Sequence, residues 1–201
     1  VFLAVPPDAV VEAYSQVPAS VPVVTDTASV KGTVMSRIGD DRFVGGHPMA
    51  GKESGGLGAA EASLFLGAYW LLCPGGPSAV ETLSSVVRSI GAKPLIMSAE
   101  EHDRHVALLS HLPHLLALHL LDLSGALPFP EVAAGSWRDL TRVAAADPAL
   151  WIQILRANAP AVADAAETLG RRLQQDAGRL RAGDTGGLER LFEARDRRGG
   201  S

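Results

Sequence analysis

A histidine on a glycine-rich segment is the first residue of the chain whose type and setting could do chemistry. His47 follows Gly45 and Gly46 and precedes Pro48. The glycines allow a tight turn or a close approach of the backbone to a ligand, and the proline fixes the exit of the chain. At the end of a strand, such a histidine could act as a general base near neutral pH. The alternative is a turn histidine that is hydrogen-bonded to the backbone, and the local sequence favours neither interpretation.

Two further pairs of residues have the spacing of neighbours on one face of a helix. His111 and His114 are at i and i+3, and Arg138 and Arg142 are at i and i+4. Both guanidinium groups can therefore reach one anion, and arginine matches a carboxylate with two hydrogen bonds. The alternative for the arginines is a solvated helix face that also carries Asp139. Together with the first histidine, these pairs predict an enzyme that moves a proton on a small carboxylated substrate.

The histidines could instead hold a metal ion, and the sequence does not favour this. The spacing of His111 and His114 suits a metal site, with Glu101, His102 and His105 as further candidates. Zinc sites need three or four well-placed ligands, and no recognised zinc signature is present. We therefore expect no metal, and we expect His102 and His105 to be exposed or packing residues. A metal-dependent hydrolase is the least favoured interpretation.

A polar segment, Asp26 to Lys31, follows an apolar run and precedes a helical pattern. Ser29 is interpreted first as a helix N-cap. In the functional interpretation, its hydroxyl and the nearby amide groups face a cofactor or substrate, because helix N-termini favour anionic groups. The two roles are compatible.

The composition is that of an ordinary globular protein. The chain has 201 residues, of which 47% are hydrophobic and 20% charged, and a net charge of -4. This charge gives no support to nucleic-acid binding. The one cysteine excludes an internal disulfide framework and fits a reducing compartment. The start of the chain has no basic region before its apolar run, and the apolar run 115–123 is too short to span a membrane. We therefore expect a cytoplasmic protein that does not bind a membrane.

Short apolar runs alternate with helical patterns over residues 1–97. This alternation predicts crossover units and a mostly parallel sheet, in which ligands bind beyond the carboxyl ends of the strands. Asp8 and Ser78 are expected to cap helices. The predicted strands are Val1–Val5, Val21–Thr25, Arg42–Gly45, Tyr69–Cys73 and Pro94–Met97, and the predicted helices are Asp8–Gln16, Ser29–Ile38, Gly58–Phe65 and Ser78–Ile90.

No strand pattern recurs after Met97. Residues Ser98 to Glu101 have the form of a capping box, and helices are predicted near 99–124, 131–145, 148–178 and 186–196. Pro113 should kink the first of these helices beside the histidine pair, and Pro160 should do the same to the third. The fold class is therefore α/β followed by all-α, with one domain over 1–97 and a second over 98–201.

In chain order, six segments of this sequence resemble prephenate dehydrogenase and its arogenate-using relatives. They are Ala4–Pro7, Asp26–Lys31, Gly46–Gly51, Glu101–Asp103, Ser110–His114 and Asp139–Arg142 with Asp147, Pro148 and Trp151. The resemblance implies that 1–97 is the C-terminal part of a Rossmann-type nucleotide-binding domain. It implies that 98–201 is a helical domain that binds substrate and pairs two subunits into a homodimer.

The resemblance also implies an activity and the residues that carry it. The activity is oxidative decarboxylation of prephenate in tyrosine biosynthesis, with hydride passing to NAD or NADP. Arogenate oxidation and a non-catalytic dimerisation remnant are the alternatives. His47 would draw the proton from the ring hydroxyl, and Ser29 would orient that hydroxyl or His47. The implied substrate-binding residues are Gly46, His111, His114, Arg138 and Arg142, and the implied cofactor-binding residues are Val5, Pro6, Pro7, Thr27, Ser29 and Lys31.

One element of the family pattern is missing from this sequence. No G-x-G-x-x-G motif follows a strand, although the family carries such a phosphate-binding motif on its first strand and helix. We expect roughly two crossover units of about 30 residues each to lie upstream. We also expect the 201-residue chain to bind dinucleotide weakly.

Overall fold

The computed structural model describes residues 1–51, 58, 60–127 and 132–199. The chain divides into two compact units, Val1–Val162 and Ala163–Ser201. The first unit contains a five-stranded sheet in the order β1-β2-β3-β4-β5. Its strands are β1 (Phe2–Leu3), β2 (Val24–Asp26), β3 (Phe43–Pro48), β4 (Tyr69–Cys73) and β5 (Lys93–Ile96).

The sheet is mostly parallel, as predicted, with one exception. β1 pairs with β2, β2 with β3 and β4 with β5 in parallel, whereas β3 and β4 are antiparallel. An antiparallel pair needs no crossover helix. The predicted helix Gly58–Phe65 is accordingly wrong in its described part, where residues 62–67 form turns. Residue 59 of that prediction lies outside the described residues.

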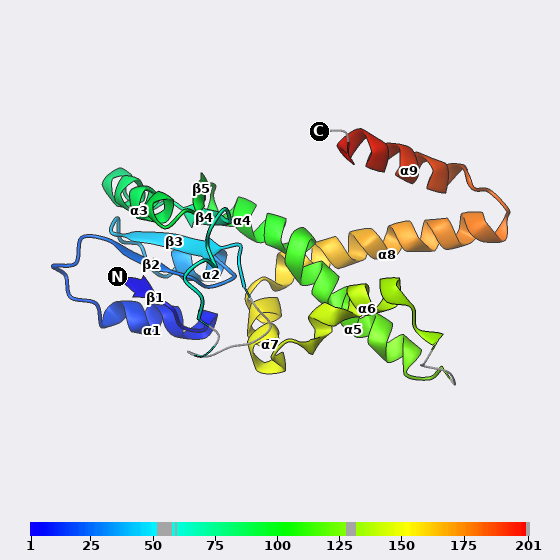
Figure 1. Ribbon diagram of the computed structural model, residues 1–201, viewed down its shortest axis with the longest axis horizontal. Helices are drawn as coiled ribbons and strands as arrows, with labels where there is room; N and C mark the ends of the chain where they lie inside the picture. The colour runs from blue at the N-terminus through cyan, green and yellow to red at the C-terminus, as the bar shows by residue number, and fades with distance from the viewer. Residues whose placement is uncertain (52–57, 59, 128–131, 200–201) are drawn as a thin grey trace. The chain divides into compact units, whose positions relative to one another are not determined.

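Two apolar clusters hold the sheet between helices (Figure 1). Phe43 packs in one cluster with residues of α1 (Val10–Ser15) and α2 (Gly32–Met35), and its neighbour Val44 packs in the other with α3 (Pro77–Ser89). Consecutive strand residues point to opposite faces, so both faces of β3 are covered. The strand is thereby fixed on both sides before it reaches His47.

The three helix caps predicted within residues 1–97 are wrong, because proline or glycine stands at these helix starts. A 3-10 turn, η1 (Pro7–Ala9), precedes α1, so Asp8 lies inside the turn. α3 begins at Pro77, with Gly76 as its N-cap, one residue before Ser78. α2 begins only at Gly32, beyond Ser29.

A long helical run follows β5 and confirms two features of the sequence. α4 (Ala99–Val106) begins with the predicted capping box of Ser98 and Glu101. A π-helical turn, η3 (Ala107–His111), then joins α4 to α5 (Leu112–Ser124), beside Pro113. Among the described residues, the run Ala99–Ser124 is the one helix long and apolar enough to cross a membrane by length and composition, with a mean hydropathy of 1.5 over 18 residues.

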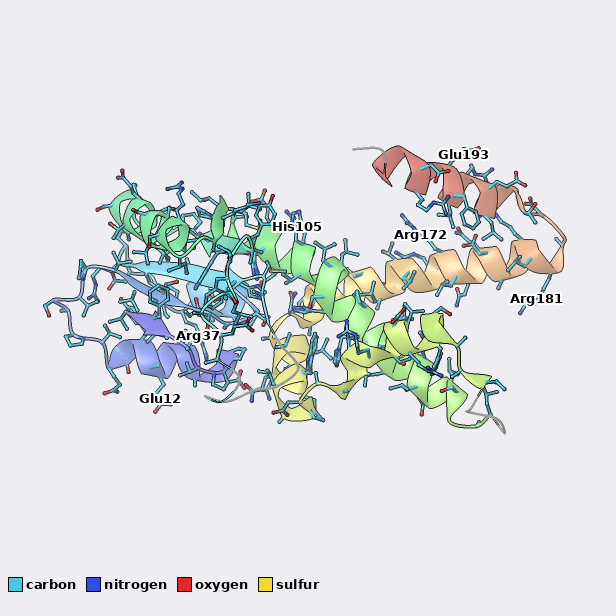
Figure 2. All side chains as sticks on the ribbon, in the orientation of Figure 1. Glu12, Arg37, His105, Arg172, Arg181 and Glu193 are labelled. Atoms are coloured by element: carbon cyan, nitrogen blue, oxygen red, sulfur yellow. The ribbon has the colours of Figure 1, made fainter. Side chains whose placement is uncertain are left out.

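The first of the remaining helices starts later than predicted. The predicted helix 148–178 is divided in two, and the last two helices extend beyond the predicted ends at 178 and 196. The elements that follow α5 are α6 (Gly135–Thr141), the 3-10 turn η5 (Arg142–Ala145), α7 (Pro148–Ala157), α8 (Ala159–Arg181) and α9 (Gly186–Gly199). The expected break near Pro160 occurs at Asn158. In the second unit, Arg172 lies on the side of α8 that faces α9, and Arg181 lies on the other side (Figure 2).

The turn after β4 holds the start of β3 through a close backbone approach. A Cβ atom on Gly75 would lie 2.1 Å from the Phe43 carbonyl oxygen, whereas one on exposed Gly39 would meet nothing within 4 Å. We expect Gly75→Ala to lower the free energy of unfolding by about 3 kcal/mol, at the upper end of the usual cost of overpacking. Urea denaturation measures this, with Gly39→Ala as the matched control. Equal stabilities of the two variants would contradict the prediction.

Candidate active site

His47 lies within strand β3 rather than on a turn. The two glycines before it are strand residues in close contact with their neighbours, and neither has a positive φ. A Cβ on Gly45 would lie 2.8 Å from the Met35 sulfur, and one on Gly46 would lie 2.5 Å from the Asp26 carbonyl oxygen. The predicted glycine turn is therefore wrong: these positions are glycine because their neighbours leave no room for a side chain.

The imidazole of His47 is hydrogen-bonded to a second histidine, which is bonded in turn to a carboxylate. His47 Nδ1 lies 2.8 Å from His102 Nε2, and His102 Nδ1 lies 2.8 Å from Asp103 Oδ1. His47 is half-buried, whereas His102 is fully buried. His102 is therefore not exposed, and its two hydrogen bonds add to the expected packing role. His105, one turn away on α4, is exposed, as expected.

Asp103 holds this chain of hydrogen bonds against helix α2. Its Oδ1 accepts the backbone N–H of Lys31 at 2.9 Å, and its Oδ2 accepts that of Gly32 at 2.8 Å. Burial alone would raise the pKa of Asp103, but the hydrogen bonds from His102, Lys31 and Gly32 outweigh it and lower the pKa. Asp103 is therefore a carboxylate that satisfies the start of α2, where backbone donors lack helical partners.

A buried ion pair joins the end of β2 to the residue before α2, near His47. Lys31 Nζ pairs with Asp26 Oδ2, and both side chains have no exposed surface. Asp26 Oδ1 also accepts the Gly46 N–H at 2.9 Å. The ammonium group of Lys31 is enclosed and already paired, and the N–H of Gly46 is already bonded to Asp26. A contact of Lys31 with a cofactor, or of Gly46 with substrate, would use other atoms of these residues and stays a prediction.

The surroundings of His47 favour its neutral form. Burial lowers its pKa well below the usual value, and repulsion from His102, Lys31 and His111 adds to this effect. An unprotonated imidazole is the form that can accept a proton at neutral pH. Because Gly46 is bonded to the residue that ends β2, His47 emerges at the carboxyl edge of the parallel strands, where α/β sheets bind ligands.

A second group of buried rings lies on the helical side of the first unit. The rings of His114 and Trp151 are stacked, with centroids 3.5 Å apart, and His111 meets Trp151 edge-on. Asn158 Nδ2 lies 2.8 Å from the Asp103 carbonyl oxygen and 3.1 Å from His111 Nδ1, so it links this group to α4. His111 Nε2 and His114 Nδ1 are buried without a hydrogen-bond partner in the described part of the chain. Buried polar atoms normally have partners, so these two nitrogens are available to a ligand.

Among the residues that the structure describes, no hydrogen bond joins Arg138 or Arg142 to His47. Arg138 lies in α6 and Arg142 begins η5, and both are exposed. Arg138 donates to the Ala133 carbonyl oxygen at 3.1 Å. The elements that carry them pack against α5, the helix of His114. A role in binding a carboxylate stays a prediction for both.

The carboxyl ends of β1 and β2 fit a dinucleotide. Leu3 and Asp26 are paired in register, so the segments that follow them lie side by side. Thr27 and Ser29 are half-buried, and neither hydroxyl has a hydrogen-bond partner among the described residues. Accessible hydroxyls without partners, at the edge where α/β sheets bind nucleotides, suit the ribose and amide groups of such a cofactor. Within the described ranges, no group of three or more His, Cys, Asp or Glu side chains could hold a metal ion.

Sequence reasoning missed Asp103 and Asn158 as parts of the site and undervalued His102. A local signal existed, because the capping box at Ser98 fixes the start of α4. That start sets which face of the helix carries His102 and Asp103. The partners of these residues on β3, at the start of α2 and at the C-cap of α7 could not be deduced from local sequence.

Two family models match the chain. Residues 1–96 match the nucleotide-binding domain of prephenate dehydrogenase, and residues 98–194 match its dimerization domain. The chain is thus a nucleotide-binding α/β sheet followed by a helical dimerization region, as the fold class predicted.

Individual proteins agree with the models. The prephenate dehydrogenase of Bacillus subtilis is 34% identical over 192 residues, which are 89% of this chain and 52% of that protein. The cyclohexadienyl dehydrogenase of Zymomonas mobilis is 37% identical over 153 residues, or 70% of this chain and 52% of that protein. A crystal structure of prephenate dehydrogenase from A. aeolicus, in complex with hydroxyphenyl propionate and NAD+, superimposes with a TM-score of 0.88 at 30% identity, covering 98% of this chain and 74% of that one. The chain belongs to the prephenate dehydrogenase family, and it spans about half the length of the curated relatives it matches.

The buried histidines should make the fold sensitive to mild acid. Burial lowers the pKa of His111 to about 4, whereas an unfolded histidine titrates near 6.5. Above pH 6.5 both states are neutral, so the shift has no effect. Between about pH 6.5 and 4 the unfolded state binds a proton that the native state does not. The free energy of unfolding should therefore fall by about 1.4 kcal/mol per pH unit for each such histidine.

Urea denaturation at a series of pH values measures this slope. In His111→Gln the slope should decrease by about one proton, while His105→Gln, at an exposed site, should keep it. An unchanged slope in His111→Gln would contradict the prediction.

Proposed function

We propose that this protein catalyses the oxidative decarboxylation of prephenate to 4-hydroxyphenylpyruvate, with NAD+ or NADP+ as hydride acceptor. The observation that carries the proposal is the half-buried imidazole of His47, whose pKa is lowered by burial, at the carboxyl edge of a nucleotide-binding sheet. The A. aeolicus relative, crystallised with NAD+ and a hydroxyphenyl acid, supports the same pairing of ligands.

His47 acts on the ring hydroxyl. The hydrogen on the hydroxyl-bearing carbon leaves as hydride, and the nicotinamide, when bound, supplies its acceptor. The ring carboxylate leaves as carbon dioxide, and its electron pair enters the ring, which becomes aromatic. His47 attracts the hydroxyl proton while positive charge develops on that carbon, and the proton returns to the oxygen as the phenol forms. The reaction therefore needs a base that stays neutral between turnovers.

The cofactor and the substrate are assigned to the two sides of His47. Ser29 and Thr27 hold the cofactor together with the β1 terminus, Val5 to Pro7, and Ser29 also orients the hydroxyl or His47. The ring acid is held from the helical side by His111 and His114, whose unpartnered nitrogens support this role. Arg142 binds a carboxylate, with Arg138 beside it.

The domain division that we propose is 1–97 for the cofactor and 98–201 for substrate binding and pairing. Two copies would associate through the helical domain, in line with the dimerization model that matches it. Exposed leucines along its first helices, Leu108, Leu109, Leu118, Leu121 and Leu123, support a covered apolar face. The free thiol of buried Cys73 fits a reducing cytoplasm.

Arogenate is the alternative substrate. The Zymomonas mobilis relative is named for the cyclohexadienyl ring, which prephenate and arogenate share. The complete gene product should be assayed with both acids, each with NAD+ and NADP+. Absence of hydride transfer with all four combinations would favour a non-catalytic dimerisation remnant instead.

His47→Asn should lower kcat by about 10²- to 10⁴-fold, the usual contribution of a positioned base. The KM for prephenate should change much less, because binding is assigned to other residues. Steady-state kinetics of the complete gene product test this, with His105→Gln as the control. Unchanged turnover would rule out the base role.

Arg142→Ala should change KM rather than kcat, in contrast to His47→Asn. Loss of a guanidinium that holds the substrate in both the ground state and the transition state raises KM and leaves kcat nearly unchanged. We expect KM to rise by about 10-fold or more, since a hydrogen bond to a charged group is worth about 1.5–3 kcal/mol. An unaltered KM would count against Arg142 as the carboxylate anchor.

A further inference from the structure

We propose that His102 is a positioning residue for the reaction. A chain of hydrogen bonds from Asp103 through His102 fixes the protons of His47, so that His47 presents an unprotonated Nε2 to the substrate. The effect of His102 on catalysis rests on the proposed function. The positions of the protons rest on the geometry of Asp103, His102 and His47.

The first step is the state of Asp103. Its two oxygens accept backbone N–H groups from Lys31 and Gly32 at 2.9 and 2.8 Å. Hydrogen bonds donated to both oxygens favour the ionised carboxylate, which can only accept hydrogen bonds. Asp103 is therefore an acceptor toward His102 as well, and the His102 nitrogen that faces it, Nδ1, must carry a hydrogen.

The second step is the position of the hydrogen on His47, which follows from that on His102. A neutral histidine has one N–H and one lone pair. Because Nδ1 of His102 donates, its Nε2 presents a lone pair to His47 Nδ1 at 2.8 Å. His47 Nδ1 must then be the donor, which leaves His47 Nε2 without a hydrogen. The opposite arrangement would turn the His102 lone pair toward a carboxylate, which has no hydrogen to donate.

Burial keeps this arrangement in place. His102 has no exposed surface, so water cannot replace either of its partners. Gly32 is part of the constraint, since a Cβ there would lie 2.8 Å from Asp103 Oδ2. When the substrate hydroxyl gives its proton to His47 Nε2, the hydrogen on Nδ1 is already directed to His102, and Asp103 lies at the far end to balance the positive charge. The same proton later returns to the product oxygen, so the chain ends each turnover unchanged.

The first experiment reads the protons directly. In protein labelled with 15N-histidine, long-range 15N–1H spectra distinguish the two neutral tautomers, and single His variants assign the signals. We expect the Nδ1–H form for both His47 and His102. The Nε2–H form at His47 would overturn the inference, whether or not the protein oxidises prephenate.

The second experiment uses a matched pair at position 102. His102→Leu removes the acceptor, so His47 should lose its fixed tautomer and kcat should fall by roughly 10²-fold or more. KM for prephenate and NAD+ should stay within about threefold, because His102 contacts neither. In His102→Gln an amide oxygen can still accept from His47 Nδ1, and kcat should recover by about 10-fold or more relative to the leucine variant.

The control and the remaining outcomes make the test decisive. His105→Gln, on the same helix with its side chain at the surface (Figure 2), should match the unmodified protein in kcat and in the His47 spectrum. Equal kcat values for His102→Leu and the unmodified protein would overturn the inference. If the leucine variant does not fold, the tautomers of the unmodified protein and the kcat of His102→Gln decide. Correct tautomers in a protein that lacks activity would refute the proposed function and leave the hydrogen-bond chain standing.

Discussion

The carboxylate of Asp103 is the interaction on which the arrangement of the site depends. It satisfies the first amide groups of α2, fixes His102, and belongs to a backbone whose carbonyl is held by Asn158. One group thus connects the sheet side of the first unit with its helices. An unpaired buried carboxylate is costly, so removal of any partner would disturb the others. The orientation of His47 is consequently a property of the packing between the sheet and α4.

Electrostatics near His47 combine a buried cation with two carboxylates. Lys31 is neutralised by Asp26, and burial lowers the pKa of Lys31 although Asp26 opposes this. Its remaining influence on His47 is to oppose protonation. A base that is protonated with difficulty suits a reaction in which the proton is only lent and then returned. The enclosed ion pair therefore has an electrostatic effect on the site without contact with any ligand.

Local sequence predicted some parts of the fold and the site, and it could not predict others. β4 was predicted with the bounds observed because it is an uninterrupted apolar run, and the Ser98 capping box was predicted because its groups are three residues apart. The antiparallel direction of β4 was missed, since a connection sets direction and the strand pattern does not record it. His102 was undervalued because its partner lies 55 positions away, and Asp103 was missed because it reaches an amide 72 positions away. Gly45 and Gly46 suggested a turn, because the sequence does not show that close packing is what excludes side chains at these positions.

The π-helical turn between α4 and α5 explains how one helix serves both halves of the site. An α-helix advances about 100° per residue, so nine residues from His102 to His111 would place them about 180° apart, on opposite faces. One extra residue in a wide turn reduces the difference to about 80°. Both side chains are in fact buried, and Asn158 contacts His111 together with the backbone carbonyl of Asp103, the neighbour of His102. Pro113 favours this turn because it has no N–H for the carbonyl four residues earlier. The proline in the histidine motif thus has a geometric function: it turns His111 and His114 toward the side of the helix on which His102 already orients the base.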